Sequence, residues 1–255
     1  MYEKDLWNNY IMIFDVFVGL LTLIAILYIA VPLWIYRVQK LPARVSFEAV
    51  DEKEFLSDQS DKFKALDNEF KEIGFEYIGS STLLDTNNST YFSLYSNAKG
   101  NTTAMLVSMR SAAGSFTYVG FSQLYAGGTM LDVSNSPAVP MYPKMGIKIS
   151  ARFPRVFEVE KLYRIFLKLK SSLKNSSPSI AYKREDGFKK VEAFIAKESD
   201  ELVALGYCKE AIDFEGKRNL TLKGAFAFTW KNVFPGKGIY DKLDQDYSHK
   251  LLGSS

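Results

Sequence analysis

A long apolar stretch near the N-terminus constrains what this chain can fold into more than any other feature. Residues 16–36 read VFVGLLTLIAILYIAVPLWIY and carry no charge. A helix of about 20 apolar residues crosses the hydrocarbon core of a bilayer. A buried helix of a soluble protein rarely stays apolar on every face over such a length. A cleaved signal peptide has a shorter apolar region followed by an Ala-x-Ala site, which is absent here. We therefore predict one transmembrane helix over residues 16–36.

Aromatic residues mark both ends of this segment. Trp7 and Tyr10 precede it, and Trp34 and Tyr36 close it, as expected for side chains that anchor a span at the two membrane surfaces. Asp15 stands at the start of the apolar run. It either pairs with another membrane subunit or lies among the lipid headgroups.

Positive charge predicts the orientation of the span. Lys4 is the only basic residue before it, whereas Arg37, Lys40 and Arg44 follow it closely. The cytoplasmic flank of a span carries the excess of Lys and Arg. We therefore expect a single-pass protein of the bacterial inner (cytoplasmic) membrane with its C-terminal domain in the cytoplasm. The single cysteine, Cys208, agrees with a reducing compartment.

Composition and motifs narrow the function further. With one cysteine and one histidine, His249, the chain lacks the four ligands of a Cys/His zinc site. A Ser-His-Asp or Cys-His group would depend on His249, which lies in a C-terminal tail that we expect to fray. No phosphate-binding loop, dinucleotide-binding glycine pattern, nucleophile elbow or metalloprotease motif occurs. We therefore expect no metal and no cofactor, and favour a non-catalytic role.

Hydrophobic periodicity divides the chain into consecutive parts. They are a short N-terminal flank (1–15), the transmembrane helix (16–36), a juxtamembrane linker (37–57), an α+β soluble domain (58–174), and a C-terminal helical segment with a short hairpin (183–255). The fold class predicted for the soluble part is α+β, with an antiparallel sheet flanked by helices.

Strand-like runs rich in aromatic and β-branched residues fill the first half of the soluble domain. They occupy residues 75–79, 91–96, 104–110, 116–125, 129–133 and 146–153. The gaps between them are short, which predicts an antiparallel meander, and Gly127-Gly128 fits a two-residue hairpin turn. Helical periodicity predicts one helix that ends before Gly74 and two more at 155–173 and 186–205.

The C-terminal segment leaves two interpretations open. Residues 211–214 and 219–222 indicate a short hairpin, after which Thr221 is placed to cap a helix over residues 224–233. This helix, GAFAFTWKNV, is almost wholly apolar, and we expect it either in the core or at the membrane surface. The hairpin with its flanking helices is similar to part of a winged-helix DNA-binding domain. However, residues 183–255 carry thirteen bases against twelve acids, which disfavours nucleic-acid binding.

Charge is segregated along the chain. Residues 48–76 carry ten acids against four bases, whereas residues 144–174 carry nine bases against two acids. Lys161, Arg164 and Lys168 fall on one face of a predicted helix. A basic helical face near a bilayer predicts attraction to anionic lipid headgroups. The alternative is a solvated face, or a face neutralised by the acidic segment.

Three polar residues stand around the Gly127-Gly128 turn in otherwise apolar runs. Ser122, Asp132 and Asn135 either line a pocket for a small molecule or satisfy the backbone of the turn through hydrogen bonds.

Three regions resemble an uncharacterised family of bacterial single-pass membrane-anchored proteins. One is the N-terminal span followed by a helix and Gly74-Phe75. The second, FSQLYAGGTMLDVSN at 121–135, is similar to a family pattern of Phe-Ser, an acidic-Gly turn and Thr-x-Leu-x-Thr-x-Asn. The third, TLKGAFAFTWKNVFP at 221–235, is similar to Thr-x-Lys-Gly-Ala-x-x-x-Thr-Trp ending in Pro. Ala126 replaces the expected acid, and Asp132-Val133 interrupts the second Thr. The resemblance implies no particular activity.

The anchor, the missing catalytic motifs, the segregated charge and an aromatic content of 15% favour an accessory or assembly subunit of a bacterial membrane complex. Its expected partners are the membrane and other membrane-protein subunits. Two alternatives stay open. One is an enzyme or binder for a lipid-like or small ligand at the membrane face, and the other is a membrane-tethered, winged-helix-like regulator.

Overall fold

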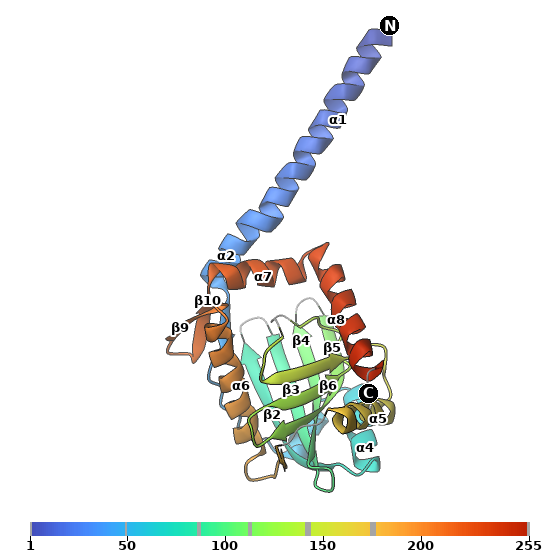
Figure 1. Cartoon of the computed structure of the whole chain (residues 1–255), viewed down its shortest axis with the longest axis vertical. Helices are drawn as coiled ribbons and strands as arrows, with labels where there is room; N and C mark the ends of the chain where they lie inside the picture. The colour runs from blue at the N-terminus through green and yellow to red at the C-terminus, as the bar shows by residue number, and fades with distance from the viewer. Residues whose placement is uncertain are drawn as a thin grey trace. The chain divides into compact units, whose positions relative to one another are not determined.

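The computed structural model describes residues 2–48, 50–85, 88–111, 114–140, 144–173 and 177–253, without the side chains of residues 2–10, 84, 85, 88 and 111. The chain forms two compact units (Figure 1). The anchor unit comprises Met1–Ala43 and Ser199–Gly238, and the sheet unit comprises Arg44–Glu198 and Ile239–Ser255. Each unit therefore combines two segments that lie far apart in the sequence.

The N-terminal part of the anchor unit is helical throughout. It consists of α1 (Tyr2–Ala25), a π-helical turn η1 (Ile26–Ala30) and α2 (Val31–Val38). The π turn comes directly before Pro32, whose ring pushes against the carbonyl four residues earlier and which has no N–H to donate. The backbone widens there, and Val31 N donates to Ile26 O, five residues back.

One helix of the described chain is long and apolar enough to cross a membrane. It runs from Ile11 to Val38, and only 6% of its most apolar part is buried inside the protein. By length and composition it fits a single-pass membrane anchor or a signal sequence.

A small antiparallel sheet follows the helix in the anchor unit. Its strands are β1 (Lys40–Pro42), β9 (Cys208–Ile212) and β10 (Lys217–Leu220), in the order β1-β10-β9. An ion pair of 2.6 Å between Lys40 Nζ and Asp213 Oδ2 joins the first strand to the hairpin. The juxtamembrane linker predicted at 37–57 contains regular structure, namely β1 and, in the sheet unit, α3 (Glu52–Ser57).

The last element of the anchor unit is α7 (Leu222–Asn232), which packs on α2. The predicted cap is confirmed, since Thr221 Oγ1 accepts a hydrogen bond of 3.1 Å from Gly224 N. The predicted hairpin is also confirmed, with Gly216 at φ +73° in its turn.

A larger sheet dominates the sheet unit. Its strands are β2 (Glu76–Asp85), β3 (Asn88–Asn97), β4 (Thr102–Ser111), β5 (Gly114–Tyr125), β6 (Met130–Ser134), β7 (Lys148–Arg152) and β8 (Ser179–Ile180). Strands β2 to β6 form the predicted antiparallel meander, and the two-residue β8 pairs with β5. The sequence did not predict that β7 runs parallel to β6. The connection between them is long enough for the chain to return to the starting end of β6.

The turn between β5 and β6 is one residue longer than predicted. Tyr125 N donates to Thr129 O (2.9 Å), and Gly128 N donates to Tyr125 O (2.8 Å). The loop therefore contains three residues, Ala126 to Gly128. Gly128 has φ +73°, the left-handed conformation that such loops require at their last position.

Helices cover one face of the large sheet and form its main core. They are α4 (Asp61–Glu72) and α5 (Val159–Ser172). Both present apolar stripes, which pack on alternate residues of β4 to β6. Fully buried members of this cluster include Phe63 and Phe70 of α4, Leu162, Phe166 and Leu169 of α5, and Leu106, Val119, Phe121 and Val133 of the sheet. Burying each side chain contributes about 1.5–3 kcal/mol.

Two further helices flank the opposite face in Figure 1, namely α6 (Gly187–Ala204) and α8 (Gly236–Gly253). Hydrophobic periodicity predicted α6 but not α8. The expectation of a frayed tail around His249 is wrong, because this residue belongs to α8. Helix α8 lies beside β7, where Arg152 N donates to Ser248 Oγ (2.8 Å). The His249 and Phe153 rings are 5.5 Å apart.

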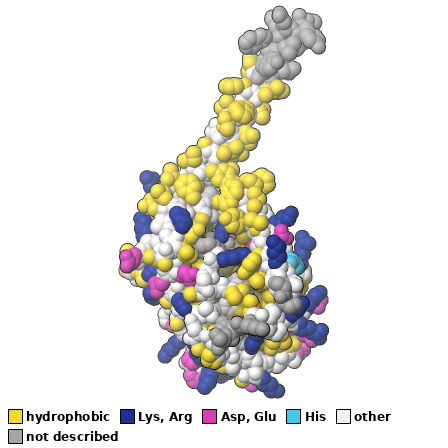
Figure 2. All heavy atoms as spheres, viewed as in Figure 1, with side chains coloured by type: hydrophobic (Ala, Val, Ile, Leu, Met, Phe, Trp, Pro, Cys, Tyr) yellow, Lys and Arg dark blue, Asp and Glu magenta, His cyan; other side chains and the backbone are white. Residues whose placement is uncertain are grey.

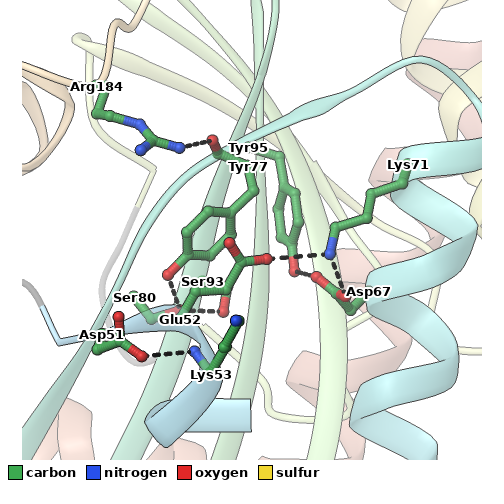
Figure 3. A network of polar contacts seen from close by, with 10 residues as sticks. All are labelled: Asp51, Glu52, Lys53, Asp67, Lys71, Tyr77, Ser80, Ser93, Tyr95 and Arg184. Atoms are coloured by element: carbon green, nitrogen blue, oxygen red, sulfur yellow. Dashed lines mark hydrogen bonds and ion pairs between the residues drawn. The ribbon is translucent and has the colours of Figure 1, made fainter.

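A buried polar network ties α4 to the sheet (Figure 3). Asp67 is 3% exposed and lies on α4 facing Tyr95 of β3, which is fully buried. Tyr95 Oη donates to Asp67 Oδ1 at 2.6 Å, while Lys71 Nζ donates to Asp67 Oδ2 at 2.8 Å. Burial, reinforced by the Asp67 carboxylate, strongly raises the pKa of Tyr95. This tyrosine therefore stays a neutral donor, and it fixes the helix to one position on the strand.

Candidate functional site

The face of the large sheet opposite α4 and α5 is hollow. A cavity of about 400 Å³ lies over β4 to β7, within the usual range of small-molecule sites. Side chains alternate between the two faces of a strand, so every second residue points into the cavity. These residues are Thr103, Met105 and Val107 of β4, Tyr118, Gly120 and Ser122 of β5, Met130, Asp132 and Ser134 of β6, and Lys148, Ser150 and Arg152 of β7.

The other walls of the cavity come from α6, α8 and two loops. Helix α6 contributes apolar side chains and one carboxylate, namely Val191, Phe194, Ile195 and Glu198. The residues that follow β6, together with Tyr182 and Asp244, complete the lining. The result is a mainly apolar chamber with hydroxyl groups and a few charges, a composition typical of ligand sites.

A charged cluster occupies the chamber floor. Lys148 Nζ of β7 lies 3.5 Å from Asp132 Oδ2 of β6 and 3.2 Å from Glu198 Oε1 of α6. Burial alone would lower the pKa of Lys148, but the two carboxylates outweigh this effect and raise it. Lys148 is therefore a fixed positive charge at neutral pH, and the cluster carries one more negative charge than positive.

Two tyrosines stand close to this cluster. Burial raises the pKa of Tyr118 to about 12, and the negative charge of Asp132 adds to the effect while Lys148 opposes it. The pKa of Tyr182 is raised by the same causes. Both phenols therefore keep their protons at neutral pH and present hydroxyl groups rather than charges.

Arg152 closes one side of the chamber. It is buried, and its guanidinium binds two carboxylates of α8: Nε donates to Asp244 Oδ2 at 2.7 Å, and Nη2 pairs with Asp241. Nη1 donates to Ser136 O at 3.2 Å. Since its donors are engaged by the chain, this arginine holds α8 in place and is not available as an anion site.

Gly120 explains why the space over β5 is open. It has no side chain, and an added Cβ would lie 3.5 Å from Ser134 Cβ, which is ordinary van der Waals contact. A larger residue at this position would therefore extend into the chamber without displacing the backbone.

The structure separates the three polar residues chosen from the sequence. Ser122 and Asp132 sit opposite each other on β5 and β6 and both line the cavity. Asn135 does not line it. Its Oδ1 accepts from Val119 N (2.8 Å), and its Nδ2 donates to Val156 O (2.9 Å), so it ties strand to loop.

Sequence reasoning missed Lys148, Glu198 and Tyr182. The alternating polar residues of β7, Lys148-x-Ser150-x-Arg152, carried a signal, because they indicate a strand with one polar face. The parallel register that sets Lys148 two strands from Tyr118, and the approach of Glu198 from α6, had no local signal.

The basic residues predicted to face lipid are exposed on α5. Arg164 pairs with Glu160 at 2.6 Å, and Lys168 Nζ donates to Leu252 O at 3.2 Å. Arg164 and Lys168, two of the three residues predicted to form the basic face with Lys161, therefore have partners within the chain. Attraction of this face to anionic headgroups stays a prediction.

The aromatic residues predicted at the anchor ends are described only in part. Trp34 is exposed, while Tyr36 is half-buried beneath Lys209, whose Nζ lies 4.7 Å from the ring centre. Trp7 and Tyr10 belong to α1, but their side chains lie outside the described part of the chain.

Among the described residues, no group of three or more His, Cys, Asp or Glu side chains is arranged to hold a metal ion. The cluster on the chamber floor places a lysine between its carboxylates, where a cation would otherwise bind.

Comparisons with known proteins give no assignment. No protein-family model, no curated protein and no solved structure matches the chain. The resemblance to a membrane-anchored family stays a prediction.

Proposed function

We propose that the chain is a membrane-anchored binding protein for a small amphiphilic molecule. The observation that carries this proposal is the chamber of about 400 Å³ with the Asp132–Lys148–Glu198 cluster on its floor. A sheet face that served only for packing would be filled by side chains, as the opposite face is. Here Gly120 and several serines leave the space open.

The charges around the chamber favour a ligand with a positive or hydrogen-bond-donating end. Its lining contains three acidic residues, Asp132, Glu198 and Asp244, and two basic residues, Lys148 and Arg152. The lining therefore carries one excess negative charge. An anionic ligand would add a second unpaired charge in a poorly solvated space, at a high cost. An amine would instead complete the pairing of the floor carboxylates, with its apolar part against Met130 and α6.

The shifted pKa values favour binding over acid–base catalysis. General acids and bases work best when their pKa lies near the working pH. In the chamber the pKa of Lys148 and that of Tyr118 both move away from neutrality. These groups therefore hold fixed protonation states, which suits recognition.

We further propose that Ile11–Val38 is a permanent anchor rather than a cleaved signal. Its last part, α2, packs on α7, and Pro32 and Ile35 are buried there. Removing the helix would expose the surface of α7 that α2 covers. It would also remove the segment that leads into β1, the strand that pairs with β10. The excess of Lys and Arg after the span supports a cytoplasmic location for the domain at the bacterial inner membrane.

Ligand-dependent thermal stability tests the binding proposal on the full-length protein in mild detergent. The probes are 2-phenylethylamine and, as its matched anion, 3-phenylpropanoate. A ligand that binds only the folded state raises the melting temperature by mass action. We expect the amine to raise it in a concentration-dependent way and the carboxylate to leave it unchanged.

Substitutions at Gly120 provide the matched control. Gly120→Leu places a side chain in the chamber and should abolish the amine effect, whereas Gly120→Ala should largely keep it. Gly120→Ala should fold, since a Cβ at this position meets only ordinary contacts, and Gly120→Leu places the rest of its side chain in the open space of the chamber. An amine effect of equal size in the Leu variant would disprove binding in the chamber.

A second candidate is the accessory or assembly subunit predicted from the sequence. The observation that favours it is Phe214, which is 95% exposed next to the β9–β10 turn. Exposed aromatic residues often anchor protein–protein contacts. Affinity purification from native membranes in mild detergent should then recover a stoichiometric membrane partner that Phe214→Ser loses. Recovery of the protein alone would argue against this role. The winged-helix-like regulator stays a prediction.

A further inference from the structure

Helix α7 exposes its large side chains and buries its small ones, the reverse of a helix in a soluble protein. Its buried residues are three small ones, Gly224, Ala225 and Thr229, and one long side chain, Lys231. Its exposed large residues are Leu222, Phe226 and Trp230, and Phe234 follows the helix end at the same spacing of four with 84% of its surface exposed. Residues four apart lie on one side of a helix, so Leu222, Phe226 and Trp230 form one apolar stripe. Phe234, beyond the helix end, adds a fourth exposed apolar side chain, and we call the four together the α7 stripe.

The small face of α7 allows close approach to its neighbours. A side chain at Gly224 would clash with the carbonyl of Tyr207, so only glycine fits there. Helix α7 also packs against α2 and the π turn. The side chains of the α7 stripe nevertheless stay 36–84% exposed, beside a helix that is itself apolar (Figure 2).

The C-terminal end of α7 reaches back along the N-terminal helix. The Trp230 ring lies 5.5 Å from the Tyr28 ring, and Tyr28 Oη donates to Phe234 O. Tyr28 precedes Tyr36 by eight residues, which is roughly 12 Å along a helix. Trp230 and Phe234 consequently lie beside the apolar segment itself, well before its end.

Helix length places this contact relative to the bilayer. The apolar helix Ile11–Val38 has 28 residues, or roughly 42 Å, whereas a bilayer core needs roughly 30 Å. About 20 residues from Ile11 reach Ala30, and beyond this point Pro32 and Ile35 are buried by the protein. Tyr28 therefore lies in the last turn of the lipid-exposed part, at the level where the hydrocarbon core meets the headgroups.

Charge around α7 suits the same location. From Thr221 to Tyr240 the chain contains no acidic residue, and two of its three lysines, Lys223 and Lys237, are exposed, whereas Lys231 is buried. Aromatic residues with basic neighbours are typical of helices that lie in the membrane interface. Anionic headgroups attract such lysines.

We propose that the α7 stripe is a second membrane-contacting surface, which lies in the interfacial region of the bilayer that the N-terminal helix crosses. The occupant of the stripe is lipid, with Trp230 and Phe234 among the upper acyl chains and the exposed Lys223 and Lys237 toward the headgroups. This inference rests on the proposed anchor. It makes the anchor unit a two-point attachment, in which α7 fixes the rotation and depth of a helix that alone could turn freely.

Depth-dependent quenching of a fluorescent label tests the proposal. Full-length variants in a Cys208→Ala background carry one cysteine, at Phe234, Phe214 or Gly19, and are labelled with a nitrobenzoxadiazole probe. Vesicles of phosphatidylcholine and phosphatidylglycerol contain lipids spin-labelled at shallow or deep acyl positions, and iodide serves as the aqueous quencher. Phe214 is the matched control, because it is a phenylalanine of the same unit that is also largely exposed, 95% against 84% for Phe234.

We expect the label at 234 to be quenched severalfold more by shallow spin labels than the label at 214, which iodide should quench instead. The label at 19, where a side chain has open space, should respond mainly to deep spin labels. Iodide quenching at 234 as strong as at 214 would overturn the α7 proposal while leaving the anchor intact. A water-exposed label at 19 would overturn the anchor itself.

A label-free measurement covers the case in which a labelled variant does not fold. Trp7→Phe with Trp34→Phe leaves Trp230 as the only tryptophan. Its emission should be quenched by shallow brominated lipids, and Phe234→Ser should weaken this quenching. Unchanged emission on removing the lipid quencher would contradict the interfacial position of α7.

Discussion

The hydrogen bond between Tyr95 and Asp67 offers the sharpest test of what holds the sheet unit together (Figure 3). In Tyr95→Phe the ring stays and only the hydroxyl is lost. Asp67 Oδ1 then loses a 2.6 Å donor inside the core, although Lys71 still binds the other oxygen. The change therefore tests one buried, charge-assisted hydrogen bond with little change in packing volume.

The expected magnitude follows from burial and charge. A hydrogen bond to a charged group contributes about 1.5–3 kcal/mol, and a buried acceptor left unsatisfied keeps most of that cost. Tyr95 and Asp67 are 0% and 3% exposed, so water cannot replace the lost donor. We expect Tyr95→Phe to lower the free energy of unfolding by about 2–3 kcal/mol, or roughly 5–10 °C in melting temperature for a domain of this size.

Tyr77→Phe is the matched control, because it removes a hydroxyl from the same sheet. Tyr77 Oη donates to Ser80 Oγ at 2.9 Å, a neutral partner, and the ring is only half-buried. Its loss should cost about 0.5–1.5 kcal/mol. Denaturant unfolding of the full-length protein in detergent, followed by circular dichroism of the sheet, measures both variants.

A double-mutant cycle isolates the pair. In an Asp67→Asn background the cost of Tyr95→Phe should shrink by about 1 kcal/mol or more, since the charged acceptor has gone. Equal costs for Tyr95→Phe and Tyr77→Phe, or a cost of Tyr95→Phe that is unchanged by Asp67→Asn, would refute the assignment of this bond as a main support of α4.

Three further predictions concern the chamber and α7. Lys148→Met removes the cation between two carboxylates and should cost about 2 kcal/mol at pH 7. The pKa of Lys148 is higher in the folded than in the unfolded state. The stability difference between the parent and the variant should therefore be largest below the unfolded pKa and shrink as pH rises toward the folded pKa, as measured by denaturant unfolding across pH. Tyr118 ionises near pH 10 when unfolded but at about 12 when folded, so stability should fall between these values. Tyr118→Phe should remove about 2–3 kcal/mol of that alkaline loss, and an unchanged alkaline limb would contradict the burial of this phenol. Gly224→Ala should lower the melting temperature by an amount that corresponds to about 1–3 kcal/mol, because the added methyl group meets the Tyr207 carbonyl. A variant as stable as the parent would show that α7 does not need this close approach.

The sequence by itself determined the elements whose signals are local. The apolar helix, the strands β2 to β6, the helices α4 to α7 and the Thr221 cap follow from periodicity, propensity and capping chemistry, which neighbouring residues decide. The glycines that end helices, such as Gly74 and Gly206 with φ +83° and +76°, follow from the left-handed conformation that only glycine adopts easily. Ser122 and Asp132 could be selected as polar residues in apolar strands, but not located in a cavity.

Only the tertiary structure decided which distant segments meet. Strand β1 pairs with β10, more than 170 residues later, and β7 joins β6 in parallel because a long connection returns it there. The floor of the chamber depends on both the β6–β7 register and the approach of α6, since Lys148, Asp132 and Glu198 come from three elements. Register and helix placement are set by the packing of whole faces, a property that no window of sequence contains. The same reason applies to α7. Its apolar composition was compatible with a place in the core or at the membrane surface, and only the fold shows that its Trp230 contacts Tyr28.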